Sequence, residues 1–340
     1  MSRQRTIGGH FYIEGRCMYS GNKVRADFWP ADPNHGIRFM TPKGAVRAVL
    51  ENVVPCRRSL MLRDPETNAE IINVEHVLAT LYAYGVDNVD IQVKKVHSKN
   101  NGTYSDNIAY YTWKAAKNMG YDIPEVFPNR PQEEYTLSCK LREESKAPVE
   151  QEAERKIIRI TEAFETEKLS FYPMCPDNLR VDPYSKTDLV MCATTVYDPV
   201  GEQKFECAVN PEVYHKHLSE ARRYAHHIIF LMKYMPEKVA YSVASFLANF
   251  AYPSFGIGHG FHTENVFLPR RTADSWFAQE KFPAEVARHT IVDRLGAIAL
   301  LGARLQGIRC IMKFSNHEND VNVLKEFEEW LKAPKVTAYK

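Results

Sequence analysis

A His–Asp pair stands at the start of a long apolar stretch near the end of the sequence. His289 and Asp293 are four residues apart, so in a helix their side chains project from one face, one turn apart. The apolar residues 294–311 that follow predict that this helix is buried. An imidazole and a carboxylate in this arrangement can supply two ligands of a tetrahedral metal ion. The simpler alternative is a solvated helix face, because isolated short motifs often occur by chance.

A second candidate motif, Glu75-His76, opens another predicted helix, whose apolar spacing continues until Gly85. A capped, exposed first turn is the structural alternative for this pair. With His289 and Asp293, however, His76 would complete the three protein ligands of a catalytic zinc, which leaves one position for water. Glu75 would then be within reach of that water and could take its proton.

A metal that activates water and polarises a carbonyl group favours amide hydrolysis. A further histidine, His317, precedes the last predicted helix. It could protonate the leaving amine.

The order of strands and helices predicts the fold class. Strands followed by helices occur twice along the chain, which indicates an α+β protein with two similar halves. The stretch 126–154, rich in Pro, Glu, Lys and Arg, is typical of a linker or a surface excursion. We therefore expect an N-terminal domain over 1–125 with Glu75 and His76, and a C-terminal domain over 155–335 with an insertion at about 224–255.

Composition limits the partners and the cellular location. A net charge of +2 gives no reason to expect nucleic acid or an anionic membrane as an obligate partner. The seven cysteines are scattered and form no C-x-x-C pair, which favours reduced thiols. The sequence contains no signal-like apolar core and no uncharged apolar run of about 18–20 residues, the length of a membrane span. We expect a soluble cytoplasmic protein without a transmembrane segment, and leave homo-oligomer formation open.

Four fragments, in the right order, carry a resemblance to a known family. They are Tyr19–Val24, Val74–Asn88, Phe282–Gly296 and Lys313–His317. Tyr19–Val24 resembles an H-T-G-K-K-V-like turn, and Val74–Asn88 is similar to V-E-H-L-x-x-A-L…G-I-D-N. Phe282–Gly296 resembles F-x-x-E-x-x-R-H-K-x-L-D-x-I-G-D, and Lys313–His317 corresponds to K-S-G-H. These are motifs of the UDP-3-O-acyl-N-acetylglucosamine deacetylases (LpxC-type), the zinc amidases that commit lipid A synthesis. The resemblance runs through most of the chain, except the linker.

The resemblance implies a role for each matching residue. His76, His289 and Asp293 correspond to the zinc ligands, and Glu75 to the general base. His317 corresponds to the general acid, or to the cation that stabilises the oxyanion. The implied architecture is two α/β layers with their helices facing each other and the metal between them.

The departures from the family pattern occur among residues expected to contact the substrate. Thr290 replaces a lysine that meets the nucleotide-sugar phosphates, and Ala297 replaces the aspartate that orients the acid histidine. Arg223 replaces a threonine near the metal; it could stabilise an oxyanion or hold a substrate anion, or be an ordinary exposed charge. Tyr19 replaces a histidine. Asp106 is retained from the family's M-D-G-S-A loop.

The expected substrate-binding residues are Tyr19, Asp106, Thr290, Tyr224 and Lys313. The segment Tyr224–Phe255 corresponds to the family's apolar passage for the fatty acyl chain. A packing element or an oligomer interface is the alternative, because aromatic residues usually form core.

The sequence thus predicts a zinc-dependent deacetylase, with Fe²⁺ as an alternative metal, that acts on an acylated amino sugar or nucleotide sugar. The lead substrate is UDP-3-O-acyl-N-acetylglucosamine. One alternative is a diverged paralogue that deacylates another amide, which Thr290 and Ala297 motivate. The other is a non-catalytic ligand-binding protein on the same fold, which has no evident need for Glu75.

Overall fold

The computed structural model describes most of the chain, with gaps. The described residues are 2–16, 23–54, 60–95, 131–174, 189–197, 201–224, 266–267, 281–313 and 317–333, with a few single positions between 236 and 243.

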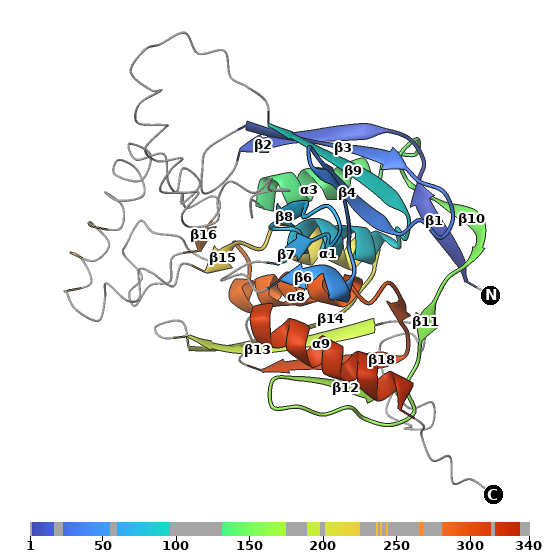
Figure 1. Cartoon of the computed structure of the whole chain (residues 1–340). Coiled ribbons are helices and arrows are strands. Elements are labelled where there is room, and N and C mark those ends of the chain that lie inside the picture. The colour runs from blue at the N-terminus through green and yellow to red at the C-terminus, as the bar shows by residue number, and fades with distance from the viewer. Residues whose placement is uncertain are drawn as a thin grey trace, which may run out of the picture.

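A five-stranded mixed sheet forms one outer layer (Figure 1). Its strand order is β2 (Phe11–Arg16), β3 (Lys23–Pro30), β9 (Val89–Lys95), β4 (Ile37–Thr41) and β5 (Gly44–Arg47). All neighbours are antiparallel except β4 and β9. Phe28, Ile91 and Phe39 are paired across three strands, and all three are fully buried. This row belongs to the face of the sheet that packs on the core, as alternation along strands requires.

Two helices cover the inner face of this sheet, α1 (Glu75–Tyr84) and α3 (Pro131–Lys140) (Figure 1). Every residue of α1 is buried. The helix ends where the sequence predicts, because Gly85 adopts a left-handed conformation with φ of 72°, which glycine tolerates best.

A four-stranded sheet forms the opposite outer layer. Its order is β12 (Leu169–Pro173), β18 (Ile308–Lys313), β13 (Leu189–Tyr197) and β14 (Gly201–Ala208). Two helices, α8 (Glu285–Ala299) and α9 (His317–Lys332), lie along it. The rings of Phe171 on β12 and Phe327 on α9 stack with centroids 4.2 Å apart, which ties α9 to the sheet.

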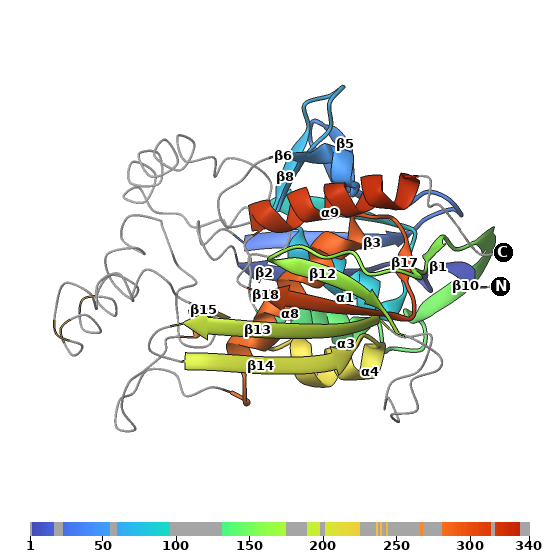
Figure 2. The same cartoon turned by 90° about the horizontal axis from the view of Figure 1, so that it is seen from below.

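The helices lie between the two sheets, and α1 faces α8 (Figures 1 and 2). Their backbones approach closely at Gly296, where an added Cβ would lie 2.1 Å from the carbonyl oxygen of Glu75. Only glycine permits this approach. The two predicted metal-ligand helices are therefore in direct contact.

Smaller elements complete the described chain. Paired strands are β1 (Arg3–Ile7) with β10 (Pro148–Glu154), β11 (Ile157–Ile158) with β17 (Arg304–Leu305), and β15 (Arg223–Tyr224) with β16 (Val266–Phe267). A third sheet contains β6 (Val53–Val54), β7 (Met61–Arg63) and β8 (Glu70–Ile72), and η1 (Leu50–Asn52) precedes β6. One turn, α4 (Pro211–Val213), continues into the π-helical turn η2 (Tyr214–Leu218).

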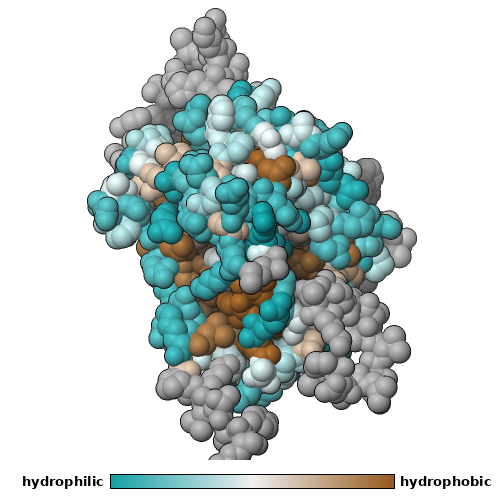
Figure 3. Space-filling model, turned by 90° about the vertical axis from the view of Figure 1, so that its right-hand side faces the viewer, coloured by the Kyte–Doolittle hydropathy of each residue, from teal (hydrophilic) through white to brown (hydrophobic). Residues whose placement is uncertain are grey.

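Hydrophilic side chains cover most of the face on the side of β1, β10 and β11, and hydrophobic ones gather in its lower part (Figure 3). Within the described chain, no helix is both long and apolar enough to cross a bilayer.

The architecture confirms the α+β class, whereas the similarity of two halves stays a prediction. The buried helix expected over 294–311, with interruptions at Gly296 and Gly302, is wrong in its second part: α8 ends at Ala299, and the apolar residues after Gly302 form β17 and β18. A fully buried strand is as apolar as a buried helix, so composition does not separate them.

The stretch 126–154 also differs from the expected linker or surface excursion. Its described part, 131–154, forms α3 and β10. Leu137 and Ser138 on α3 are fully buried, so this helix is part of the core. The domain boundaries at 125 and 155 stay a prediction.

Candidate metal centre

The first turn of α1 places Glu75 and His76 inside the protein. Glu75 is fully buried and His76 is 3% exposed. The exposed first turn considered for this pair is therefore wrong. The backbone N–H of Leu60 donates to Oε2 of Glu75 over 3.2 Å, which fixes the carboxylate beside the helix start.

The first turns of α8 bring His289 and Asp293 to the same place. The Nε2 atom of His289 lies 3.6 Å from Oδ1 of Asp293, and Nε2 of His76 lies 3.5 Å from the same oxygen. One possible ligand atom from each residue lies within 4.8 Å of the other two. Metal–ligand bonds of about 2.0–2.1 Å separate the ligands of a tetrahedron by roughly 3.4 Å. The observed spacing fits a zinc-sized ion.

A buried carboxylate orients the imidazole of His76. Its Nδ1 atom lies 2.7 Å from Oε2 of Glu134 on α3, and the hydroxyl of Tyr214 donates to the other oxygen of Glu134. The Tyr214 hydroxyl also lies 2.9 Å from Oγ1 of Thr80. A metal-bound histidine usually engages its second nitrogen in this way, which fixes the ring and its tautomer.

This arrangement leaves Nε2 of His76 facing the other ligand atoms. The atom is buried and has no hydrogen-bond partner among the described residues, which is costly unless another group, such as a cation, binds there. Burial lowers the pKa of His76, but the charges of Glu134, Asp293 and Glu75 outweigh it and raise the pKa to about 9. Burial in turn raises the pKa of the Glu134 carboxyl, against the opposing effect of His76. The cluster is therefore a site that attracts positive charge.

The ring of His289 is oriented by backbone. Its Nδ1 atom lies 2.9 Å from the carbonyl oxygen of Ala221. The next residue, Arg222, is held by Glu285, which accepts from the Arg222 backbone N–H over 3.0 Å and from its guanidinium over 2.7 Å. Glu285 lies one turn before His289 on α8, so this buried ion pair ties the helix that carries His289 to the segment that carries the Ala221 carbonyl.

Asp293 is the most solvent-exposed of the three candidate metal ligands. Its side chain is 16% exposed, whereas those of His76 and His289 are 4% and 7% exposed. A ligand would therefore reach the cluster from the side of Asp293.

The remaining predicted residues lie in different surroundings. Thr290 donates its hydroxyl to the carbonyl oxygen of Val286 over 3.0 Å, so it is engaged within its own helix. Lys313 is exposed at the end of β18. Ala297, which replaces the family's aspartate, is 1% exposed and packs in the core.

Other expected residues are only partly described, or not at all. His317 is the first residue of α9, and Arg223 and Tyr224 form β15, but their side chains lie outside the description. Tyr19, Asp106 and most of the segment 224–255 lie outside the described residues.

Glu134 was missed by sequence reasoning because it lies in the presumed linker. A signal was available: Pro131 followed by Glu133 and Glu134 is typical of a helix start, since proline suits the first turn and acidic residues suit the N-terminal end. Nothing in the sequence pairs this turn with His76, 58 residues away.

The fold and the cluster together define an α+β protein with a candidate mononuclear metal centre between two facing helices. A family model described as UDP-3-O-acyl N-acetylglycosamine deacetylase matches residues 4–98. The chain is 24% identical to the UDP-3-O-acyl-N-acetylglucosamine deacetylase of Aliarcobacter butzleri over 339 residues, which cover 96% of this chain and 90% of the relative. The enzyme of the same name from Wolinella succinogenes is 22% identical over 333 residues, which cover 96% and 92%.

The bifunctional enzyme LpxC/FabZ of Bacteroides thetaiotaomicron is more similar over a shorter stretch, with 32% identity over 97 residues. That match covers 27% of this chain and 21% of the relative, so the chain spans about a fifth of the bifunctional relative's length. The chain is thus similar, at low identity and over most of its length, to UDP-3-O-acyl-N-acetylglucosamine deacetylases, and the family model covers its first part.

Proposed function

We propose that this protein is a metal-dependent deacetylase that hydrolyses the N-acetyl amide of an acylated amino sugar. The lead substrate is UDP-3-O-acyl-N-acetylglucosamine, the compound in the names of its relatives, and the proposed reaction is a step of lipid A synthesis. The observation that carries this proposal is the meeting of His76, His289 and Asp293 at tetrahedral spacing, beside the buried carboxylate of Glu75.

The three donors would hold a divalent ion. Two imidazoles and one carboxylate form a ligand set of catalytic zinc, and Fe²⁺ accepts the same ligands. When bound, the ion would supply Lewis acidity for the amide carbonyl and for water. Glu134 and Ala221 would keep the imidazoles in the tautomer that presents Nε2.

Proton transfer would fall to side chains of this chain. Glu75 is one residue from His76 and would accept the proton of the attacking water. We propose His317 as the group that protonates the leaving amine, and Arg223 as a cation that stabilises the developing oxyanion. Thr290, Lys313, Tyr224, Tyr19 and Asp106 stay proposed substrate contacts.

The second candidate is deacylation of a different amide by the same chemistry. Two observations favour it. The hydroxyl of Thr290 is engaged by Val286 within α8, and Ala297 is buried without a polar atom to orient an acid histidine. The change at Thr290 would weaken recognition of a nucleotide-sugar diphosphate. The change at Ala297 would weaken the transfer of a proton to the leaving amine.

Acetate release from purified, zinc-loaded protein tests the proposal. We expect release from UDP-3-O-acyl-N-acetylglucosamine, with a rate at least 100-fold lower in Glu75→Gln and unchanged in Glu143→Gln, an exposed glutamate on another surface. Release from simpler N-acetyl amino sugars alone would favour the second candidate. Zinc binding without hydrolysis of either substrate, and full biological activity of Glu75→Gln, would contradict catalysis and indicate a ligand-binding protein.

A further inference from the structure

A cavity of about 240 Å³ lies at the ends of α1 and α8 remote from the metal cluster. Tyr82 near the end of α1 and Ala299 at the end of α8 line it. His76 and Tyr82 are six residues apart, which corresponds to about 9 Å along a helix. The cavity also takes residues from β1, β5 and β17, so the five-stranded sheet and two of the smaller strand pairs contribute to its wall.

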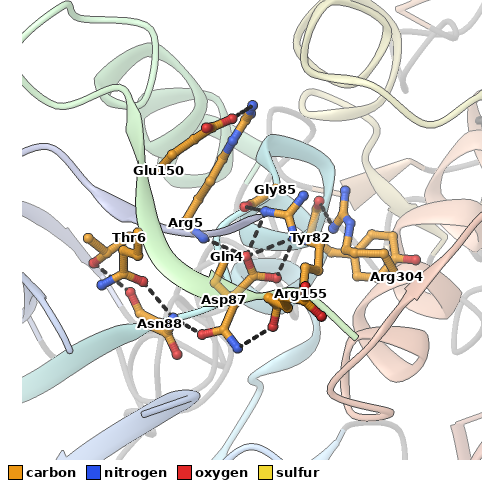
Figure 4. A network of polar contacts seen from close by, with 12 residues as sticks. Gln4, Arg5, Thr6, Tyr82, Gly85, Asp87, Asn88, Glu150, Arg155 and Arg304 are labelled. Atoms are coloured by element: carbon orange, nitrogen blue, oxygen red, sulfur yellow. Dashed lines mark hydrogen bonds and ion pairs between the residues drawn. The ribbon is translucent and has the colours of Figure 1, made fainter. Parts of the chain in front are cut away.

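The charged groups around this cavity are mostly cations. Arg47, Lys156 and Arg304 line it, with Asp87 as the carboxylate of the lining. Asp87 is already neutralised, because Arg155 donates to it from Nε and from a terminal nitrogen over 2.9 and 2.6 Å (Figure 4). The backbone N–H of Arg5 adds a bond of 2.7 Å. The lining therefore carries uncompensated positive charge.

Arg304 supplies the most confined of these charges. Its guanidinium stacks on the ring of Tyr82 at 3.8 Å and donates to the Tyr82 carbonyl oxygen (Figure 4). Among the described residues, no carboxylate lies within ion-pair distance of it. Burial lowers the pKa of Arg304, the physical sign of a cation that lacks full solvation. A guanidinium has five N–H donors, so most of its hydrogen-bonding capacity is left for a ligand.

Two side-chain amides of the lining, those of Gln4 and Asn88, are already hydrogen-bonded. The side-chain amide of Gln4 donates to Asn34 over 2.8 Å and to the Glu154 carbonyl oxygen over 2.9 Å. Asn88 donates to Gln4 over 2.8 Å and to Gln151 over 2.7 Å (Figure 4). The N–H groups of the Gln4 and Asn88 amides are therefore already engaged, and the charge that can attract a ligand comes from the three cations.

We propose that this cavity is a binding site for a small ligand with at least two negative charges on oxygen, either a phosphate ester or a dicarboxylate. Two charges suit three cations, and the planar fork of Arg304 fits both kinds of oxygen anion. The volume is below the range of about 300–1,000 Å³ that is typical of drug-sized ligands, which indicates a compact molecule. The site shares no residue with the metal cluster and does not depend on the proposed deacetylase activity.

Thermal unfolding at constant ionic strength tests the proposal, with sodium phosphate, malonate and chloride as probes. We expect phosphate, malonate or both to raise the unfolding midpoint of the metal-loaded protein in a saturable way, while chloride does not. The more effective probe distinguishes a phosphate ester from a dicarboxylate. Isothermal titration then gives the dissociation constant.

Variants link binding to the cavity. Arg47→Gln with Lys156→Gln removes two exposed cations that have no ion-pair partner among the described residues, and should weaken binding about tenfold or more. Lys43→Gln with Lys325→Gln removes the same charge from residues outside the cavity lining, and should leave binding unchanged. Equal weakening in both double variants, or no saturable effect of phosphate or malonate, would overturn the proposal.

Discussion

The closest contact between the two ligand-bearing helices gives the sharpest test of the site. Replacing Gly296 by Ala would place a Cβ 2.1 Å from the carbonyl oxygen of Glu75 and 2.7 Å from its Cα. Non-bonded heavy atoms are most stable at about 3.5–4.0 Å, so the backbones must separate by roughly 1.4 Å or more to restore ordinary contact. The atom that must move belongs to the residue directly before His76.

The size of the effect follows from the geometry of the cluster. A shift of this size compares with a metal–nitrogen bond of about 2.0–2.1 Å, so His76 would leave bonding distance while His289 and Asp293 stay on α8. We expect zinc affinity to fall by about 100-fold or more. Overpacking costs about 1–3 kcal/mol, but Ala gains about 1 kcal/mol over Gly in a helix. The free energy of unfolding should therefore change by about 2 kcal/mol at most.

Zinc competition against a chromophoric chelator measures the affinity, and chemical unfolding of metal-free protein measures stability. Gly302→Ala is the matched control. Its φ of 59° is unfavourable for alanine and costs about 1–2 kcal/mol, but the added Cβ meets nothing within 4 Å. It should lose stability and keep its zinc affinity. Wild-type zinc affinity in Gly296→Ala would refute the argument that helix spacing sets the metal geometry.

Three further predictions concern the protons and the metal. Glu134→Gln should reduce zinc affinity, measured by equilibrium dialysis, by about 10–100-fold, because it removes the charged partner of His76. The control Glu143→Gln should show no such loss. Equal zinc affinities of the two variants would exclude a role of Glu134 in orienting His76. His76 has a folded-state pKa of about 9, above its ordinary value of 6.5, so its charged form stabilises metal-free protein fully below pH 6.5, and this contribution is lost as pH rises towards 9. Chemical unfolding of chelator-treated protein should show this decline in stability, and the Glu134→Gln variant should show a smaller one. Zinc affinity should rise about tenfold per pH unit over the same range, because the bound ion displaces a proton from His76. A zinc affinity that does not change with pH would contradict the raised pKa. Chelation should abolish acetate release and added Zn²⁺ or Fe²⁺ should restore it, whereas activity that survives complete metal removal, checked by elemental analysis, would exclude the proposed chemistry.

The two structural departures at the substrate side have different consequences for specificity. Thr290 is tied to Val286 by its hydroxyl and lacks the length and charge of a lysine. Ala297 is enclosed in the core, so a carboxylate placed there without other changes would be buried at high cost. We therefore expect the phosphates of a nucleotide sugar to be met by other cations, if that substrate is bound.

The local sequence determined the features that depend on interactions between residues close together in the chain. The four-residue spacing of His289 and Asp293 places both on one helix face whatever the rest of the chain does, since the period of the helix sets it. The end of α1 follows from Gly85, which accepts a left-handed conformation more readily than other residues. The pattern of strands and helices was enough to predict the α+β class.

Tertiary structure decided what depends on contacts between distant residues. That Glu134 orients His76, and that Glu285 and Arg222 hold the carbonyl bound by His289, follows from packing across 58 to 68 residues. Short sequence patterns do not specify which residues that are distant in the chain will pack together. Tertiary contacts also determined that α8 ends at Ala299 and that strands follow it. A segment buried on all sides is apolar in either conformation, and only hydrogen bonding to neighbouring strands selects the strand.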